Sequence, residues 1–442
     1  MIGGRGKGRR RDLVLAIVLG QRSWMVADER SLKSLKSGVG VCNPEMGVKA
    51  DDSSVSSTSP EVHDSVATSP QSSIIISPPL SFDRHGIYNT GLEAKQKGLV
   101  YQVLDILKTT SDLASFQVPV PINLPKSQLQ CYGEQVFCSK QDLLGPCADG
   151  QTPLDRFVAV VRWHISLVRP VPFAKAPYNP ILGETHHVTA GDLNLITEQV
   201  SHHPPVTALY ATNSKRKIEI LQWNFSQPKF YGNSVSVGVG GRRTLTLLVH
   251  GEIYETTSPA LTFRFWPGVV SEWTGDTMVK CAQTGLEAVV SFKSKSYFST
   301  KGNQVSGKIF RTSSQQNLYT LSGSWDESVM LEGKGGKKSV LYDGKVNLSN
   351  MKTSVVENPR ALSPTESVVV WSQVTKGVWN QDWEAARAAK TSVEETQRAL
   401  RKQREKAGET WKPKYFNKLA DGGWEWALKG QPVPPAPIKW QK

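Results

Sequence analysis

The chain has few cysteines: five in 442 residues, an odd number with irregular spacing. None stands in a Cys-x-x-Cys pair, so the sequence predicts neither a disulfide framework nor a cysteine zinc site. Free thiols persist in reducing compartments, and we therefore expect a cytoplasmic protein. The five residues are Cys42, Cys131, Cys138, Cys147 and Cys281.

Long apolar runs are also lacking. No segment approaches the ~20 apolar residues that a membrane-spanning helix requires. The nearest candidate runs from Leu13 to Gly20 behind a basic cluster, which is similar to a signal peptide. It is short, and Gln21-Arg22 follows it instead of the small residues of a cleavage site. We therefore expect an irregular N-terminus rather than a secretion signal or a transit peptide.

Motifs of catalysis and of nucleic-acid binding are equally scarce. We find no nucleophile elbow, no phosphate-cradling glycine loop and no helix-turn-helix, zinc-finger or RNA-recognition signature. Two vicinal pairs, His186-His187 and His202-His203, bring a metal-dependent hydrolase to mind, but short zinc motifs usually space their ligands as His-x-x-x-His. We expect neither an enzyme nor a resident metal or cofactor, and the hydrolase stays a remote alternative.

Acidic residues are outnumbered, since 53 Lys and Arg stand against 39 Asp and Glu and give a net charge of +14. Such a balance favours an anionic partner, either nucleic acid or a membrane surface. Each basic residue near an anionic leaflet contributes about 1 kcal/mol to binding. Because no nucleic-acid motif is present, we expect peripheral contact with anionic membranes and no binding to nucleic acid.

Composition divides the chain into three parts. Residues 1–90 are first basic and then rich in Ser, Thr and Pro. Such a segment cannot bury enough apolar surface to offset its conformational entropy, so we expect it to be mostly disordered. Residues 91–425 carry the apolar periodicity of a folded domain, and residues 426–442 form a proline-rich tail, in which we expect irregular structure from Gly430 to Pro437.

The period changes within the folded part. A short amphipathic stretch from Gly98 and a helical stretch from Leu154 to Leu167 come first. Between about residues 170 and 345, short alternating runs recur with Gly, Asn and Ser between them, which is typical of an all-β barrel or sandwich. Helical spacing returns between about residues 365 and 420. No internal repeat indicates a solenoid or a propeller.

The most distinctive motif is the octapeptide Glu-Gln-Val-Ser-His-His-Pro-Pro, which ends at Pro205. Vicinal histidines on a regular strand point to opposite faces, but at a strand end both rings can turn toward one anion. Imidazolium donates hydrogen bonds and carries its charge near neutral pH, so His202 and His203 suit a phosphate monoester. For the dipeptide alone, a partly buried structural strand end is the simpler interpretation.

A second candidate lies in the C-terminal helical part. Lys390, Glu394 and Arg398 are spaced i, i+4 and i+8, so they form one row along a helix. The two cations can bind a phosphate while the glutamate orients them. From spacing alone, a solvated row with an ion pair between Glu394 and Arg398 explains the pattern as well.

Three blocks of the sequence, in the same order, resemble the oxysterol-binding protein family over roughly residues 95–420. The first runs from Lys175 to Thr185 and contains Asn-Pro-Ile-Leu-Gly-Glu, the second is the octapeptide, and the third runs from Lys390 to Arg398. Trp411 and Tyr415-Phe416 follow the third block as they do in the family. The chain is similar to short, plant-like members without a pleckstrin-homology domain.

The resemblance implies an α+β fold that is mainly β: a large antiparallel β-barrel enclosing a lipid tunnel, with an N-terminal lid and helices and a C-terminal helical subdomain. It also implies a grip on the head group of phosphatidylinositol 4-phosphate. The implied residues are His202, His203, Lys175, Tyr178, Asn179, Lys390, Glu394 and Arg398.

One of these positions departs from the family. The family has a lysine immediately before the first proline of the Asn-Pro block, whereas here Ala176 precedes Pro177 and Lys175 stands one residue earlier. Either Lys175 reaches the phosphate from a shifted position or one cationic contact is missing. Tyr178 and Asn179 would contribute backbone N–H donors.

The function that the resemblance implies is lipid transfer. A cytoplasmic, monomeric protein would bind a sterol or phosphatidylinositol 4-phosphate in one enclosed cavity and exchange them between membranes, at the endoplasmic reticulum or other organelle contacts. Burying a sterol gains about 25 cal/mol per Å² of apolar surface, which a barrel interior provides. Phosphatidylserine is the alternative second lipid, and a lipid sensor that does not transport would use the same site.

Overall fold

The computed structural model describes most of the chain beyond residue 118 and one short segment before it. The described residues are 74–83, 119–173, 175–231, 233–266, 269–295 and 302–441. The chain divides into two compact units between Ser73 and Ile74, and every described residue belongs to the second unit. Most of the segment 1–90 and the amphipathic stretch after Gly98, where the lid is expected, lie outside the described residues.

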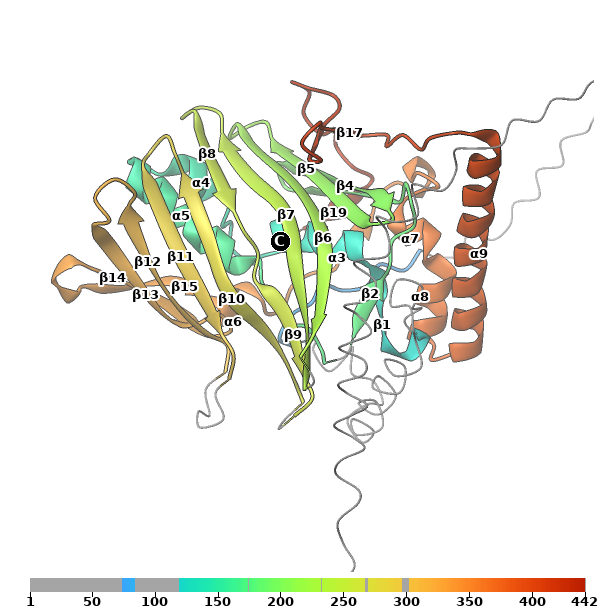
Figure 1. Cartoon of the computed structure of the whole chain (residues 1–442), viewed down its shortest axis with the longest axis horizontal. Coiled ribbons are helices and arrows are strands. Elements are labelled where there is room, and N and C mark those ends of the chain that lie inside the picture. Colours follow the sequence, from blue (N-terminus) through green and yellow to red (C-terminus); the bar gives the residue numbers. More distant parts are fainter. Residues whose placement is uncertain are drawn as a thin grey trace, which may run out of the picture. The chain divides into compact units, whose positions relative to one another are not determined.

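Fifteen of the described strands form one sheet (Figure 1). Its order is β15-β14-β13-β12-β11-β10-β8-β7-β6-β5-β4-β3-β19-β16, and β9 pairs with β10 and β7. All neighbours pair antiparallel except β19 and β3, which are parallel. The strands of this sheet are β3 (Thr185–Ala190), β4 (Leu193–His202), β5 (Pro205–Asn213), β6 (Ile218–Phe230), β7 (Ser234–Leu247), β8 (Glu252–Thr256), β9 (Ala260–Arg264), β10 (Val270–Cys281), β11 (Leu286–Lys293), β12 (Gln304–Arg311), β13 (Asn317–Ser324), β14 (Ser328–Gly333), β15 (Lys338–Asp343), β16 (Val355–Val356) and β19 (Ile438–Trp440).

Two small sheets flank the large one. β1 (Asn123–Ser127) pairs parallel with β2 (Ala176–Tyr178), and β17 (Phe416–Lys418) pairs antiparallel with β18 (Trp424–Trp426). The helices are η3 (Val120–Ile122), α3 (Gln128–Phe137), α4 (Gly145–Asp149), α5 (Pro153–Ser166), η4 (Lys334–Gly336), α6 (Gly344–Asn347), η5 (Pro359–Ala361), α7 (Ser367–Val370), α8 (Ser372–Trp379) and α9 (Trp383–Ala407). None of the helices in the described ranges is both long and apolar enough to cross a membrane.

Helices α3 and α5 begin where the sequence supplies their caps. The Ser127 side chain accepts from the backbone at the start of α3, and Gln130 reaches back to close a capping box. Thr152 and Asp155 form the same motif at α5, with Pro153 in the first turn. Both helices therefore start at fixed points beside the sheet.

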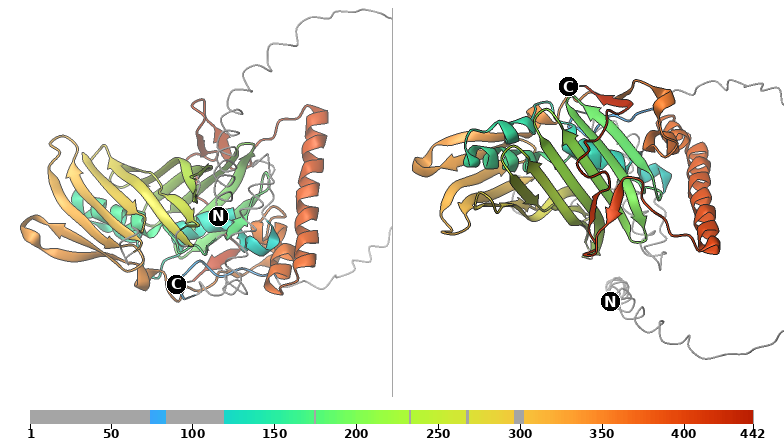
Figure 2. Two further views of the ribbon diagram at one scale, coloured as in Figure 1. Left: turned by 60° about the horizontal axis from the view of Figure 1, so that its bottom comes forward. Right: turned by 90° about the horizontal axis from the view of Figure 1, so that it is seen from above.

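The core lies between these helices and the sheet, which curves around α3, α4 and α5 (Figure 2). Phe157, Trp163 and Ile165 of α5 are fully or almost fully buried and belong to one cluster with the inner residues of the strands, such as Val290. Strand β11 shows the expected alternation, with every second residue buried. The mainly β architecture with helical segments before and after the large sheet is confirmed.

The packed core does not extend along the whole of β7. In its second half Arg243, Leu245 and Leu247 are buried in alternation. The first half, residues 234–240, is only half-buried at every position. The neighbouring strand β9 is also half-buried throughout. The helices thus pack on the sheet at the C-terminal end of β7, and no described residues bury its N-terminal end to the same degree.

Helix α9 lies on the side of the sheet toward which β4 runs, next to α8 (Figure 1). Asp382 caps its start through a hydrogen bond from the Ala385 N–H, and Gly408 ends it in the left-handed conformation at φ +65°. Ala386 and Lys390 are buried, whereas nearly all residues beyond Arg398 are exposed. One half of the helix therefore packs and the other half stays accessible.

The chain from Gly430 to Pro437 forms neither helix nor strand, as its composition predicts, but a strand that was not predicted follows it. Ile438–Trp440 form β19, which joins the large sheet between β3 and β16. Val433, Ala436 and Ile438 are buried. The prolines keep the preceding segment extended, and the chain then pairs with β3. These residues are part of the folded unit.

Candidate functional site

The two histidines lie at the end of β4, as the motif predicts. His202 is the last residue of the strand, and His203 stands in the turn to β5. Their ring centroids are 4.8 Å apart with an interplanar angle of 72°. His203 is exposed, while the Nδ1 atom of His202 is buried and has no hydrogen-bond partner among the described residues. The strand end therefore presents two adjacent imidazoles, one with unused hydrogen-bonding capacity.

The surroundings of His202 disfavour the protonated form of its ring. Burial lowers its pKa, and the charges of His203 and Arg401 lower it further, while the Pro180 carbonyl acts in the opposite direction. A bound phosphate would reverse this balance because an anion stabilises the charged ring. Binding of an anion at His202 would therefore be coupled to proton uptake.

Arg401 joins this group, although the sequence motifs did not single it out. Its Nη1 donates to Nε2 of His203 at 3.2 Å. A guanidinium can only donate, so Nε2 of His203 is the acceptor. The available signal was the spacing: Arg401 follows Arg398 by three residues and so lies on the same side of α9. The contact links the strand end to the helix.

The row on α9 forms as its spacing predicts. Nζ of Lys390 lies 4.0 Å from Oε1 of Glu394, and Nη2 of Arg398 lies 3.6 Å from Oε2 of the same residue. Lys390 is buried and donates to Oδ1 of Asn123 at 3.1 Å, whereas Arg398 is half exposed. Burial lowers the pKa of Lys390, and it raises the pKa of Glu394 against the effect of the two cations. Glu394 thus pairs with both the buried Lys390 and the more exposed Arg398, and the three side chains form one row along α9.

Lys175 is placed beside the same helix by the small parallel sheet. Its Nζ donates to the Pro121 carbonyl at 2.8 Å, and burial lowers its pKa to about 8. Asn123, the partner of Lys390, pairs with Ala176 across β1 and β2. Lys175 and Lys390 therefore both contact the segment formed by η3 and β1. Lys175, which stands one residue before the position at which the family has its lysine, thus lies against η3.

The side chain of Tyr178 has a structural setting. It is fully buried, stacks on Trp371 with ring centroids 4.7 Å apart, and shares a hydrogen bond with Thr375. Burial raises the pKa of its hydroxyl. Asn179, the next residue, is exposed. A contribution of these two residues through their backbone N–H groups stays a prediction.

Arg401 and the predicted residues whose side chains lie near α9 fall into two groups along this helix. One group holds His202, His203 and Arg401, and the other holds the row beginning at Lys390 together with Lys175. Lys390 and Arg401 are eleven residues apart, roughly 16 Å along a helix axis. A single phosphate cannot span the two ends in this arrangement, so a ligand with several polar groups fits the row better than a lone anion.

Two buried glutamates of the motifs hold the blocks together. The Glu184 carboxylate is fully buried, and burial raises its pKa against the effect of its hydrogen bonds. Its donors are the Ser127 hydroxyl, the Ser367 hydroxyl at 2.7 Å, the Trp371 indole at 2.9 Å and the Ile181 N–H at 3.0 Å. Glu198 accepts from the backbone N–H groups of Lys414 and Tyr415 at 2.7 and 2.9 Å. Both residues therefore fix the sequence blocks of the site to neighbouring segments of the chain.

Gly183 explains another part of the Asn-Pro block. It adopts φ +79°, and a Cβ atom there would lie 2.6 Å from the Trp411 ring. Only glycine accommodates both the conformation and the close approach. This contact joins the first block to the segment that follows α9.

The other histidine pair does not contribute to the site. Nδ1 of His186 is 2.6 Å from Oε1 of Glu366, and Nε2 of His187 is 2.8 Å from the Pro434 carbonyl. The described ranges contain no group of three or more His, Cys, Asp or Glu side chains placed to hold a metal ion.

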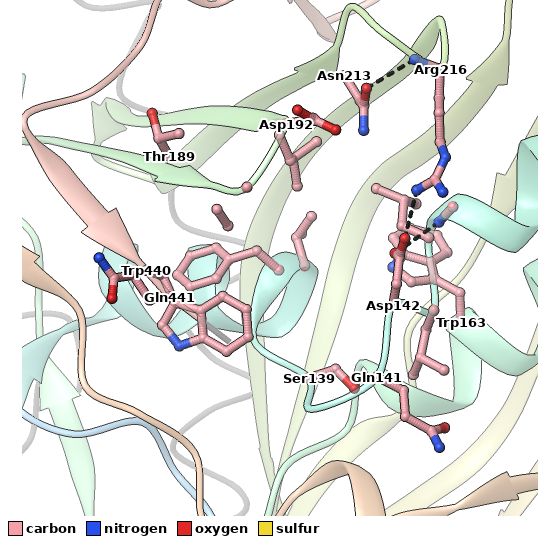
Figure 3. Close-up of a pocket in the computed structure, with 18 of the residues that line it drawn as sticks. Ser139, Gln141, Asp142, Trp163, Thr189, Asp192, Asn213, Arg216, Trp440 and Gln441 are labelled. Atoms are coloured by element: carbon pink, nitrogen blue, oxygen red, sulfur yellow. Dashed lines mark hydrogen bonds and ion pairs between the residues drawn. The ribbon is translucent and has the colours of Figure 1, made fainter.

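A pocket of about 560 Å³ lies elsewhere, between α3, α5 and the end of β19 (Figure 3). Ser139, Asp142, Trp163, Arg216 and Trp440 are among the residues that line it. An ion pair between Arg216 and Asp142 closes one side at 2.5 Å. None of the predicted head-group residues lines this pocket, so it is separate from the candidate site.

Comparison with known proteins identifies the family of the chain. The family model for oxysterol-binding proteins matches residues 102–434. Oxysterol-binding protein-related protein 4B of Arabidopsis thaliana is 44% identical over 356 residues, which cover 78% of this chain and 93% of that protein. Protein 4A of the same species is 42% identical, with 78% and 92% covered.

Solved structures show the same fold at lower identity. The Osh1 ORD domain in complex with cholesterol superposes with a TM-score of 0.61 at 22% identity, covering 74% of this chain and 86% of that one. The Osh3 ORD of Saccharomyces cerevisiae in complex with PI(4)P gives 0.61 at 22%, covering 81% and 92%. With the three sequence blocks, the large sheet and the family match in agreement, the chain belongs to the oxysterol-binding protein family.

Proposed function

We propose that this protein transfers lipids, exchanging a sterol for phosphatidylinositol 4-phosphate between membranes through one enclosed cavity. The observation that carries the proposal is the pair of imidazoles at the end of β4, with an unpartnered Nδ1 on His202 and with Arg401 of α9 on His203. Histidine and arginine are both donors suited to phosphate. The family membership and the lipid complexes of Osh1 and Osh3 support the assignment.

Each side chain has a separate task in the proposed grip. His202 and His203 donate to the phosphate, with His202 taking up a proton as the anion arrives. Arg401 and Arg398 are exposed and can turn toward the head group, while Glu394 pairs with Arg398 and positions Lys390. No covalent step is required.

The second lipid is the less determined partner. Osh1 is described in complex with cholesterol and with ergosterol, which favours a sterol here. Phosphatidylserine is the alternative, since it too would occupy an apolar interior. If one cavity accepts either lipid but never both, a gradient of the phosphoinositide drives the second lipid in the opposite direction. A sensor that binds without transporting would show the same binding and no net flux.

The test is lipid extraction by the full chain from vesicles that contain labelled sterol and labelled phosphatidylinositol 4-phosphate. We expect mutual displacement of the two lipids by the wild type. The variant H202A/H203A should lose phosphoinositide extraction and keep sterol extraction. H250A is the matched control, because His250 is an exposed histidine whose ring contacts the Ala148 carbonyl, in the turn between β7 and β8.

Other outcomes would redirect the assignment. Phosphoinositide extraction without sterol competition would shift the second lipid to phosphatidylserine. Binding without net flux between two vesicle populations would indicate a sensor. Extraction of neither lipid by the wild type would refute the proposal.

A further inference from the structure

Two turns near one end of β7 carry exposed hydrophobic side chains. Tyr231, which follows β6, is 62% exposed. Trp266 and Val269, between β9 and β10, are 71% and 39% exposed. Large aromatic side chains bury more apolar area than most others, so leaving a tryptophan and a tyrosine in water is unfavourable unless something covers them. The described elements do not cover them.

The two turns are held together as one unit. The Phe265 N–H donates to the Asn233 carbonyl at 2.8 Å, and the Asn233 side chain donates to the Trp266 carbonyl at 3.3 Å. Strand pairing continues this contact, since Ser234 of β7 lies opposite Arg264 of β9. The aromatic residues are therefore displayed from a braced double turn, which lies at the end of β9 in Figure 1.

Basic residues surround this double turn. Lys229 lies on β6 close to Tyr231, and Lys293 and Lys295 lie at the end of β11; all three are exposed. Arg264 donates to the Lys295 carbonyl at 2.9 Å and pairs with the buried Glu272 at 3.2 Å. Four cations thus stand against one carboxylate that is already paired.

Aromatic residues beside exposed cations match the surface of an anionic bilayer. Tryptophan and tyrosine are enriched at the membrane interface, where an apolar ring with a polar edge is at its most stable. Lysine and arginine are attracted to anionic head groups within about a Debye length. The alternative occupant is a protein partner with an acidic, apolar surface. Three of the four cations are lysines, whose long flexible side chains can adjust to lipid head groups, and this favours the bilayer.

We propose that Tyr231, Trp266 and Val269 form a membrane-docking tip that enters the interface of an anionic bilayer. This inference deepens the proposed lipid transfer, because a transfer protein must meet the membrane from which it collects its ligand. The first half of β7, which the helical core leaves half-buried, leads directly to this tip. The tip would hold that end of the sheet against the lipid surface.

The first experiment compares binding of the full chain to phosphatidylcholine vesicles with and without phosphatidylserine. Y231S/W266S should weaken binding to the anionic vesicles by roughly tenfold or more, since two aromatic side chains no longer leave water. The control L248S/V249S alters the turn at the opposite end of β7, where these residues are 49% and 71% exposed. It should bind as the wild type does. Unchanged binding by Y231S/W266S, or an equal loss in the control, would overturn the proposal.

A second measurement tests insertion. Brominated phosphatidylcholine should quench the wild-type tryptophan emission more than that of W266F, which keeps an aromatic ring and should still bind. Equal quenching in the two proteins would mean that Trp266 stays outside the bilayer, as adsorption by charge or a protein-binding role of the tip would require. If Y231S/W266S unfolds, the single variant W266S with a wild-type thermal transition replaces it.

Lipid loading separates this proposal from the function on which it rests. After long incubation Y231S/W266S should carry as much lipid as the wild type, although it loads more slowly. A wild type that binds vesicles through the tip but extracts no lipid would refute lipid transfer and leave the tip intact. Loss of final loading along with the loss of docking would instead place these residues in the lipid site.

Discussion

At the scale of single residues, the state of His202 links the site to pH. Burial lowers its pKa below the ordinary value, so the ring is neutral in the free protein near pH 7. The unfolded chain binds this proton more readily than the folded one, so this residue's contribution to stability is present at neutral pH and declines as pH falls below about 6.5. Ligand binding has the opposite dependence, since a phosphate favours the protonated ring.

We therefore expect phosphoinositide affinity to rise as pH is lowered from 8 to about 6, over the range in which His202 begins to take up its proton. H202Q cannot titrate and should bind more weakly with a flatter profile. Equilibrium binding of labelled phosphatidylinositol 4-phosphate across this range is the measurement, with sterol binding as the reference that should not change. If the affinity of H202Q depended on pH as that of the wild type does, the pH dependence would belong to a group other than His202.

At the scale of elements, α9 divides into a packed and an exposed half, and the boundary falls within the candidate site. Lys390 and Glu394 lie in the packed half, whereas Arg398 and Arg401 lie in the exposed half. In the proposed grip, the packed half would fix the helix while the exposed arginines reach a ligand without any movement of the helix. The left-handed Gly408 ends the helix just beyond these residues.

Arg401 should matter more than the cation beside it. R401A removes the hydrogen bond to His203 and the charge-assisted contact that we propose to the head group, and we expect phosphoinositide affinity to fall roughly tenfold. K402A removes an equal charge from the next residue, which points about 100° away around the helix. It should bind nearly as the wild type does. Affinity is measured by titration in low and moderate salt. Equal losses of affinity in R401A and K402A would show that Arg401 acts through the general positive charge of the helix and makes no specific contact.

At the scale of the whole molecule, the large sheet depends on a strand that the sequence did not reveal. β19 is three residues long and follows a proline-rich segment, so no periodicity marks it. Its existence is decided by pairing with β3 and by burial of Ile438 and Trp440 in the main core. Tertiary pairing here forms a strand directly after the irregular segment, at residues whose local composition gives no sign of it.

Ile438→Ala tests this dependence. The side chain is fully buried, so the variant should lose about 2–5 kcal/mol of unfolding free energy through lost apolar contact and a cavity. V355A on the neighbouring β16 removes an exposed side chain and should change stability by less than about 0.5 kcal/mol. Equilibrium denaturation of both variants gives the comparison. A loss at Ile438 as small as that at Val355 would show that the segment is dispensable to the fold.

The sequence predicted those features that depend on local spacing or on a distinctive motif. The ion pairs of the α9 row followed from i, i+4 spacing, and the adjacent histidine rings followed from their place at a strand end. Contacts between distant segments could not be predicted in this way. The carbonyl that binds Lys175 and the stacking of Tyr178 on Trp371 depend on chain segments far from each motif.

The parallel pairing of β19 with β3 has a consequence for synthesis. Val188 of β3 is made long before Ile438, its partner in β19, so one edge of β3 has no neighbour while the intervening residues are translated. An unpaired strand edge is a site for mistaken association. The sheet can be completed only when the segment around residue 440 has left the ribosome, so this edge of β3 stays open to mistaken association until then.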